Sequence, residues 1–202
     1  MIKAIISDLG NVITPFDWSV FCKSFSKYCN LSEQEIKKLV VDSNMKDDYE
    51  RGKITSKEFW KQVKKMTKSD ISYRKFCYIW SNIFTINRPL VELLNKLRKR
   101  YPLFLLSNTN EVHFRSLSKR VKVLSHFKGF ILSYETGLVK PDLRIFREAV
   151  RSTGCKPAEC VYIDDIKEYT DTACKLGLKG LRYTTFTKLK IDLKALGVLS
   201  YA

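Results

Sequence analysis

Near its beginning the chain carries Ile2-Lys3-Ala4-Ile5-Ile6-Ser7-Asp8-Leu9-Gly10-Asn11-Val12. Residues 2–6 are mostly apolar and β-branched, and such a short run ahead of a glycine-containing loop is typical of a strand buried on both faces of a parallel sheet. Asp8 follows this strand, at the edge where open α/β sheets bind their ligands. It is therefore a candidate reactive group, and an aspartate that only begins a turn is the plainer alternative.

Four more short apolar runs lie in the second half of the chain, with helical patterns between them. They predict strands at 103–106, 130–132, 160–163 and 180–183. Single helices between successive strands imply right-handed crossovers and a mostly parallel sheet. Because the carboxyl ends of parallel strands share one edge, we expect the polar residues after these strands to meet there. They include Asp8, Ser107, Asn108, Thr109, Asp164 and Asp165, with Lys140 arriving at the start of a predicted helix.

From Asp17 to about Phe84 the apolar spacing is helical, and no strand is predicted. Ser32 and Thr55 have the residue types of helix N-caps. The helix after Thr55 is expected to bury Phe59, Val63 and Met66. We therefore predict an α/β fold whose Rossmann-like core, residues 1–14 and 89–202, is interrupted by an all-helical block, residues 15–88.

Charge and cysteine content limit the partners and the compartment. The 202 residues include 37 Lys and Arg against 21 acids, a net charge of +16, which would suit an anionic partner such as a phosphorylated metabolite or nucleic acid. The basic residues are scattered over several predicted helices, so we expect a solvated surface and no specific nucleic-acid site. Six cysteines without metal-ligand spacing, no secretory leader and no membrane span lead us to expect reduced thiols in a cytoplasmic protein.

Four ordered motifs resemble those of the haloacid dehalogenase (HAD) superfamily of phosphatases. They are Asp8-Leu9-Gly10-Asn11-Val12, Ser107-Asn108-Thr109-Asn110, Lys140-Pro141 and Asp164-Asp165. The helical block falls where this superfamily inserts a cap domain. The chain is also similar to the bacterial sugar-phosphate phosphatases typified by α-D-glucose-1-phosphate phosphatase, in Asp8 to Ile13, Glu50-Arg51-Gly52, and His113 after the second motif.

The resemblance implies a chemistry for each motif. Asp8 would attack phosphorus to give an aspartyl-phosphate that water hydrolyses. Mg²⁺ would be held by Asp8, the backbone carbonyl of Gly10, Asp164 and Asp165. Lys140 would add positive charge, and the Ser107 hydroxyl with the backbone amides near Asn108 and Thr109 would bind phosphate oxygens. Taken singly, Lys140 could be a solvated helix-start lysine, Ser107 a turn residue and Asp164 an N-cap.

One position departs from the superfamily pattern. Members commonly carry a second aspartate two residues after the nucleophile, as general acid and base, and this chain has Gly10 there. The glucose-1-phosphatase-like group also has glycine, and sugar 1-phosphates have comparatively acidic leaving groups. Asp17 and His113 are possible accessory groups, with helix N-capping and packing as their respective structural alternatives.

The function expected from these features is a Mg²⁺-dependent phosphatase for a small phosphorylated metabolite, such as a sugar monophosphate. The alternative is a catalytically weak or inactive binding or regulatory protein of the same fold, because of Gly10. A phosphomutase is disfavoured by Gly10, and a dehalogenase by the acidic pair. Specificity should depend on the cap, where Arg51 and Trp80 could contact a sugar or be structural. The oligomeric state is left open.

Overall fold

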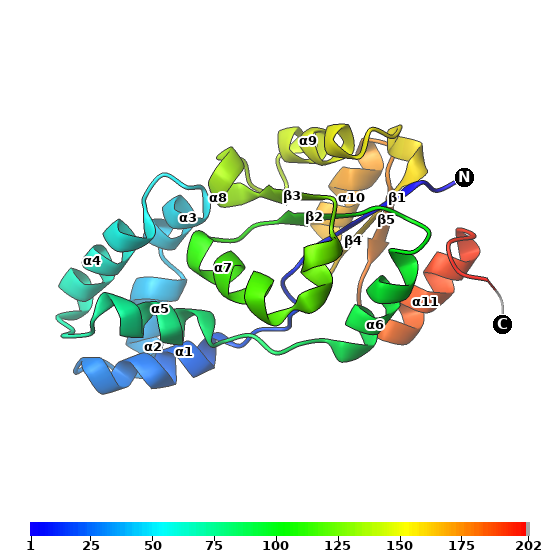
Figure 1. The fold of residues 1–202 in the computed structure, drawn as a ribbon. Coiled ribbons are helices and arrows are strands. Elements are labelled where there is room, and N and C mark those ends of the chain that lie inside the picture. The colour runs from blue at the N-terminus through cyan, green and yellow to red at the C-terminus, as the bar shows by residue number, and fades with distance from the viewer. Residues whose placement is uncertain (201–202) are drawn as a thin grey trace.

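A computed structural model describes residues 1–200, so the last two residues of the predicted 89–202 segment lie outside the described residues. Its centre is one five-stranded sheet in the order β3-β2-β1-β4-β5, and every neighbouring pair is parallel (Figure 1). The predicted α/β fold with a parallel, Rossmann-like sheet is confirmed. The strands are β1 Ala4–Ser7, β2 Leu103–Ser107, β3 Gly129–Leu132, β4 Cys160–Asp164 and β5 Lys179–Arg182.

Strand β1 occupies the middle of the sheet because both of its faces are apolar. Ile5 packs into a cluster on one face with Leu103 and Leu105, whereas Ile6 packs into a cluster on the other face with Phe104. The helices α6 Arg88–Leu97, α7 Glu111–Arg120 and α11 Phe186–Ala195 supply the first cluster, and α9 Leu143–Thr153 and α10 Lys167–Lys175 supply the second. A three-layer arrangement results.

The helical block, residues 15–88, has an apolar cluster of its own. Five α-helices contribute to it: α1 Trp18–Phe25, α2 Glu33–Ile36, α3 Asn44–Glu50, α4 Ser56–Thr67 and α5 Tyr73–Ser81. Its centre is aromatic, with Phe21, Phe59 and Trp80 fully buried. Ser32 and Thr55 are N-caps, as predicted, and each forms a capping box. In Figure 1 these helices stand to the left of the sheet.

Two paired segments join the helical block to the sheet. The Asp17 amide donates to the Ile83 carbonyl at 3.0 Å, and the Thr85 amide donates to the Pro15 carbonyl at 2.8 Å. Phe16 and Phe84 form an antiparallel bridge between these hydrogen bonds. The chain therefore leaves after β1 and returns before α6 along one two-stranded connection.

Short helical elements complete the description. The helix α8 Ser133–Thr136 follows β3 directly, and 3-10 turns occupy Ser26–Tyr28, Lys122–His126 and Pro157–Glu159. A π-helical turn, Lys37–Val41, extends α2. Within residues 1–200, every helix is too short or too polar to cross a bilayer, and the six cysteines are free thiols.

The predicted core position of Met66 is wrong, and Phe130, in the predicted strand 130–132, is less buried than its apolar run suggests. Met66 is 45% exposed, and Thr67 takes the inward place instead, because the four-residue spacing that starts at Phe59 and Val63 continues to Thr67. Phe130 is 38% exposed, because β3 is an edge strand with only β2 beside it.

Candidate active site

Three adjacent strands bring the predicted motifs to one edge of the sheet. Asp8 follows β1, Ser107 ends β2 and Asp164 ends β4. The strand order changes direction at β1, since β2 and β3 extend the sheet on one side and β4 and β5 on the other. Such a switch point is where open α/β sheets bind ligands.

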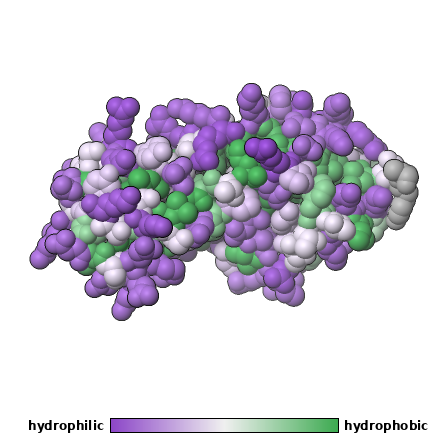
Figure 2. All heavy atoms as spheres, turned by 90° about the horizontal axis from the view of Figure 1, so that it is seen from below, coloured by the Kyte–Doolittle hydropathy of each residue, from purple (hydrophilic) through white to green (hydrophobic). Residues whose placement is uncertain are grey.

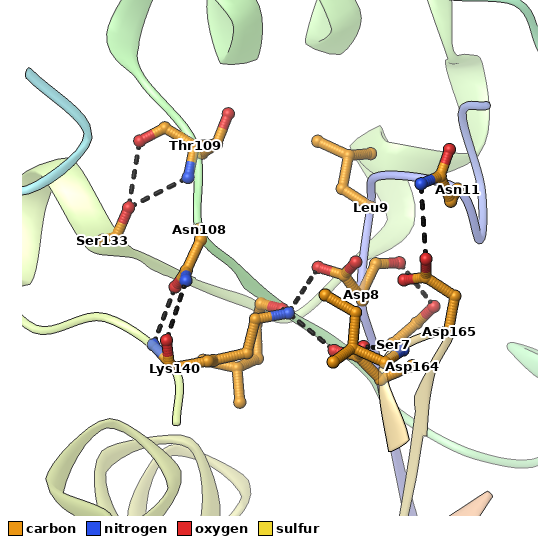
Figure 3. A network of polar contacts seen from close by, with 12 residues as sticks. Ser7, Asp8, Leu9, Asn11, Asn108, Thr109, Ser133, Lys140, Asp164 and Asp165 are labelled. Atoms are coloured by element: carbon orange, nitrogen blue, oxygen red, sulfur yellow. Dashed lines mark hydrogen bonds and ion pairs between the residues drawn. The ribbon is translucent and has the colours of Figure 1, made fainter. Parts of the chain in front are cut away.

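Lys140 connects two of these strand ends (Figure 3). Its Nζ lies 2.8 Å from Asp8 Oδ1 and 2.6 Å from Asp164 Oδ2, and it also donates to the Leu106 carbonyl at 3.4 Å. The Lys140 side chain is 2% exposed, so it is no solvated lysine. The helix α9 begins only at Leu143, with Asp142 as N-cap. The sequence predicted Lys140 at the start of this helix. Lys140 lies instead in the loop that precedes the helix.

Two of the predicted phosphate-binding residues, Asn108 and Thr109, make hydrogen bonds within the protein that the sequence did not predict. The Asn108 side chain clamps the backbone of Lys140, accepting from its amide at 2.8 Å and donating to its carbonyl at 3.1 Å. The Thr109 amide donates to Ser133 Oγ at 2.9 Å. Ser107 is buried and lines a cavity beside Gly10. Of these three residues, Asn108 and Thr109 already have partners within the protein.

Asp164 is held on both of its carboxylate oxygens. Oδ1 accepts the Ile166 amide at 2.9 Å, and Oδ2 accepts both Lys140 and the Tyr162 hydroxyl. Tyr162 lies two residues before Asp164 on β4, so both side chains project from the same face of the strand. Its ring also lies near the Lys140 ammonium group. These contacts fix the direction of the Asp164 carboxylate.

The three predicted acidic ligands form one cluster. Carboxylate oxygens of Asp8, Asp164 and Asp165 lie within 4.8 Å of one another. Asp165 is half-buried, and its Oδ2 accepts from the Asn11 side chain at 3.3 Å. Three carboxylates against the single charge of Lys140 leave an excess of negative charge. Hard oxygen donors with uncompensated charge fit a divalent cation such as Mg²⁺.

The titration of these groups reflects the same imbalance. Burial raises the pKa of Asp8 to about 7; Lys140 opposes this shift and Asp164 adds to it. Burial also raises the pKa of Asp165, and the nearby Asp164 contributes. For Lys140, burial disfavours the charged form, but Asp8 and Asp164 outweigh it and raise the pKa.

A small cavity of about 60 Å³ adjoins this cluster. Leu9, Gly10 and residues 107–109 line it from the sheet, and Phe16, Trp18 and Glu50 line it from the first linker and the helical block. A Cβ on Gly10 would lie 3.1 Å from the Phe16 ring. Phe16 therefore occupies the space into which a second acidic side chain would extend.

Asp17 and His113, the two possible accessory groups, have the structural roles that were their alternatives, which are helix N-capping for Asp17 and packing for His113. Asp17 is the N-cap of α1 and accepts from the Ser19 amide and hydroxyl, both at 2.8 Å. His113 is buried, and Nδ1 lies 3.0 Å from the Asn110 side-chain nitrogen and Nε2 2.9 Å from the Trp80 carbonyl. Burial lowers the pKa of His113 to about 3. Its ring is therefore neutral, with both nitrogens engaged.

In the helical block, Arg51 and Trp80 are the residues expected either to contact a sugar or to be structural, and Gly52 follows Arg51. Trp80 is fully buried within the aromatic cluster, whereas Arg51 is exposed at the end of α3. Gly52 has a φ of +68°, and a Cβ there would lie 2.1 Å from the Tyr134 carbonyl. Gly52 thus forms a turn seated against α8.

Sequence reasoning missed Tyr162, Phe16 and Glu50 as parts of the site. For Tyr162 a signal existed, because residues two apart on a strand share a face and Asp164 was already a candidate. Glu50 belongs to the Glu50-Arg51-Gly52 stretch that carries part of the resemblance, but that stretch gave it no role in the site. No local signal placed Phe16 or the Glu50 side chain at the cavity, because their places depend on how the helical block packs on the sheet.

Comparison with known proteins agrees with this geometry. The model of the haloacid dehalogenase-like hydrolase family matches residues 2–168. A D-ribitol-5-phosphate phosphatase from Bacteroides thetaiotaomicron is 26% identical over 172 residues, which are 82% of this chain and 84% of that protein. A crystal structure of a HAD family enzyme from the same organism, in complex with magnesium and inorganic phosphate, superposes with a TM-score of 0.83 at 27% identity, covering 94% of this chain and 99% of that one.

A HAD-like hydrolase from Porphyromonas gingivalis shares the fold, with a TM-score of 0.80 at 24% identity over 97% of this chain and 98% of that one. The family match covers strands β1 to β4, the helical block and all four motifs, and it ends in the first turn of α10. The chain therefore belongs to the haloacid dehalogenase-like hydrolase family, and it is an enzyme of the hydrolase class.

Proposed function

We propose that the protein is a Mg²⁺-dependent phosphatase that hydrolyses a small phosphorylated metabolite through an aspartyl-phosphate on Asp8. The observation that carries this proposal is the buried Lys140, bonded to Asp8 and Asp164 at once. A catalytic carboxylate, a cation that neutralises phosphate charge and an acidic cluster that suits a metal ion are the parts that phosphoryl transfer requires.

Asp8, Asp164, Asp165 and the Gly10 carbonyl would hold Mg²⁺. When bound, the ion supplies positive charge that offsets the repulsion between a carboxylate and an anionic phosphate. A free Asp8 oxygen attacks phosphorus, and Lys140 favours the ionised form of the attacking carboxylate. The Ser107 hydroxyl, in the adjoining cavity, binds a phosphate oxygen.

A sugar or sugar-alcohol monophosphate is the substrate class that we favour. The relative from Bacteroides thetaiotaomicron is named for ribitol 5-phosphate, and the resemblance of the nucleophile loop and of Glu50-Arg51-Gly52 keeps glucose 1-phosphate among the candidates. The two differ in the leaving group, since an anomeric oxygen is more acidic than a primary alcohol. The dependence on the leaving group therefore separates them.

Residues 15–88 act as a cap over a core of residues 1–14 and 89–202 in this proposal. The separate aromatic cluster and the paired linker support this division. So does the cavity beside Gly10, which both parts line. At about 60 Å³, the cavity is a small part of the space that a sugar phosphate would need beside Asp8.

The test is phosphate release from a panel of phosphorylated metabolites, with Mg²⁺ or with EDTA, by the wild type and by Asp8→Asn. We expect release only with Mg²⁺ and only from the wild type, while the variant keeps the wild-type circular dichroism. Undiminished release by Asp8→Asn would remove Asp8 as the nucleophile.

One observation favours a second function, a binding or regulatory protein of the same fold. Gly10 lacks a carboxylate and Phe16 fills the space beside it. If no metabolite is turned over, and beryllium fluoride with Mg²⁺ does not raise the melting temperature, this second function replaces the first.

A further inference from the structure

The nucleophile loop provides no proton for the leaving group, if the proposed phosphatase function holds. Position 10 is glycine, and the Phe16 ring stands 3.1 Å from where its Cβ would be. An alkoxide is a poor leaving group without a proton donor, and general acid–base assistance is worth about a hundredfold to ten-thousandfold. A donor must therefore come from another part of the cavity wall.

Among the described residues that line this cavity, Glu50 and His113 are the two with ionisable side chains. His113 is unsuitable, because both ring nitrogens are engaged, by Asn110 and by the Trp80 carbonyl. Burial keeps its pKa near 3, so the ring carries no proton to give near neutral pH. Glu50 is left.

Glu50 is the last residue of α3, and its side chain is 19% exposed. Three aromatic residues share the cavity wall with it: Phe16, Trp18 and Phe84. Lys46, one turn earlier on α3, holds one Glu50 carboxylate oxygen at 3.0 Å. Within residues 1–200 the other oxygen accepts no hydrogen bond, so it can face a substrate.

The end of α3 is fixed against the helices α8 and α7 of the predicted core. Gly52 packs on the Tyr134 carbonyl so closely that a Cβ would lie 2.1 Å from the oxygen. Tyr49, adjacent to Glu50, accepts from the Val112 amide of α7 at 3.4 Å and bonds Ser56 at 2.9 Å. These contacts hold Glu50 at the cavity although it belongs to the helical block.

The charged surroundings of Glu50 suit a group that cycles between protonated and ionised forms. Burial raises the pKa of Glu50; Lys46 opposes this shift and Asp47 adds to it. The same cavity is lined by the neutral His113 of α7 and, from the nucleophile loop, by Gly10, two residues after Asp8.

We propose that Glu50 is the general acid and base of this active site, supplied by the helical block in place of the missing second aspartate. In the first step an Asp8 oxygen bonds to phosphorus, the bond from phosphorus to the ester oxygen breaks, and that oxygen takes its proton from the Glu50 carboxyl group. In the second step the Glu50 carboxylate takes a proton from water as the water oxygen bonds to phosphorus. The bond between phosphorus and Asp8 then breaks, which releases inorganic phosphate and restores both residues.

The test compares two phosphate esters in wild type, Glu50→Gln and Asp48→Asn. Asp48 is a matched control, since it is a half-exposed acid on α3 that pairs with Lys53 and does not line the cavity. The two esters are ribitol 5-phosphate and p-nitrophenyl phosphate. The leaving alkoxide of ribitol 5-phosphate needs a proton, whereas the p-nitrophenolate of the second ester leaves without one. For Glu50→Gln we expect kcat/KM on ribitol 5-phosphate to fall about a hundredfold or more. The same variant should release p-nitrophenolate in a first-turnover burst near the wild-type rate, followed by slow turnover because the base is missing.

Equal losses on both esters in the first turnover, or no loss on either, would overturn the role of Glu50 while leaving the phosphatase intact. If Glu50→Gln does not fold, Glu50→Ala with added formate is the second variant, and the proposal requires formate to restore turnover of the alkyl ester. A wild type that turns over neither ester, or an Asp8→Asn variant as active as the wild type, would instead refute the proposed function on which this role rests.

Discussion

The centre of the helical block and the polar edge of the sheet are both largely buried, but apolar side chains fill the first and charged side chains the second. The block has aromatic rings at its centre, such as Phe21 and Trp80 with ring centroids 4.8 Å apart. The edge has charges at its centre, with Lys140 between Asp8 and Asp164. Figure 2 shows a surface on which hydrophilic residues predominate over both parts, broken by hydrophobic patches.

The two regions contribute to different properties, the helical block to the stability of the fold and the polar edge to the chemistry. Aromatic packing stabilises the fold through buried apolar area and close contacts. A buried cluster with more acids than bases contributes little to stability and can oppose it, because each charge loses its hydration. Substitutions in the block should therefore change the free energy of unfolding, whereas substitutions at the edge should change turnover, and stability as well where they leave a buried carboxylate without its partner.

The largest effect is expected for Lys140→Met. This change removes the charge that faces both Asp8 and Asp164, so we expect phosphatase turnover to fall by about a hundredfold to a thousandfold. It also leaves two buried carboxylates without their partner, which should destabilise the metal-free protein by about 3–5 kcal/mol.

Turnover assays and urea unfolding measure the two effects of Lys140→Met. Lys3→Met, which breaks an exposed pair with Glu159, serves as control and should leave both nearly unchanged. Wild-type turnover in Lys140→Met would show that the edge does not use its central charge.

The next largest effect is expected in the aromatic cluster. Trp80→Ala should lower the free energy of unfolding by about 3–5 kcal/mol, because a fully buried indole leaves a cavity. Trp80→Phe should cost much less, since the Trp80 Nε1 is buried without a hydrogen-bond partner within residues 1–200. Chemical denaturation gives both values, and a fall in stability as large for Phe as for Ala would contradict this account.

A smaller effect is expected for Tyr162→Phe, which removes only the hydroxyl that Asp164 accepts. Groups that orient a metal ligand typically change affinity by about tenfold to a hundredfold. We therefore expect weaker Mg²⁺ binding by isothermal titration calorimetry, near the lower end of this range because Lys140 still holds the same oxygen. Unchanged Mg²⁺ affinity would mean that the hydroxyl serves packing alone.

The smallest effect is expected for Asp17→Ala. Asp17 only caps α1, so the variant should melt a few degrees lower, about what one N-cap contributes. Its kcat should equal that of the wild type at every pH. A changed pH profile would instead return Asp17 to the catalytic groups.

Much of the sheet and of its polar edge could be predicted from the sequence. The apolar runs that contain Ile5 and Leu105 predicted strands covered on both faces. Parallel pairing brings the carboxyl ends of these strands to one edge of the sheet. Asp8, Lys140, Asp164 and Asp165 are close together for that reason, although they are far apart in the chain.

The rest depends on contacts between the helical block and the sheet, which no local pattern encodes. Helical spacing predicted helices from Asp17 to about Phe84, but it could not show whether Trp80 is buried or faces the site. It could not show that Phe16 fills the place beside Gly10, or that Glu50 reaches the cavity. Met66 was misplaced because one helical turn offers two similar inward positions.

The most direct test of the central claim is to trap the covalent intermediate. Enzyme in turnover with Mg²⁺ is quenched, reduced with tritiated borohydride, which converts an aspartyl-phosphate to labelled homoserine, and mapped by peptide mass spectrometry. We predict that the label lies at Asp8 in the wild type and is lost in Asp8→Asn together with turnover. Label on any other residue, or full turnover by Asp8→Asn, would contradict the account.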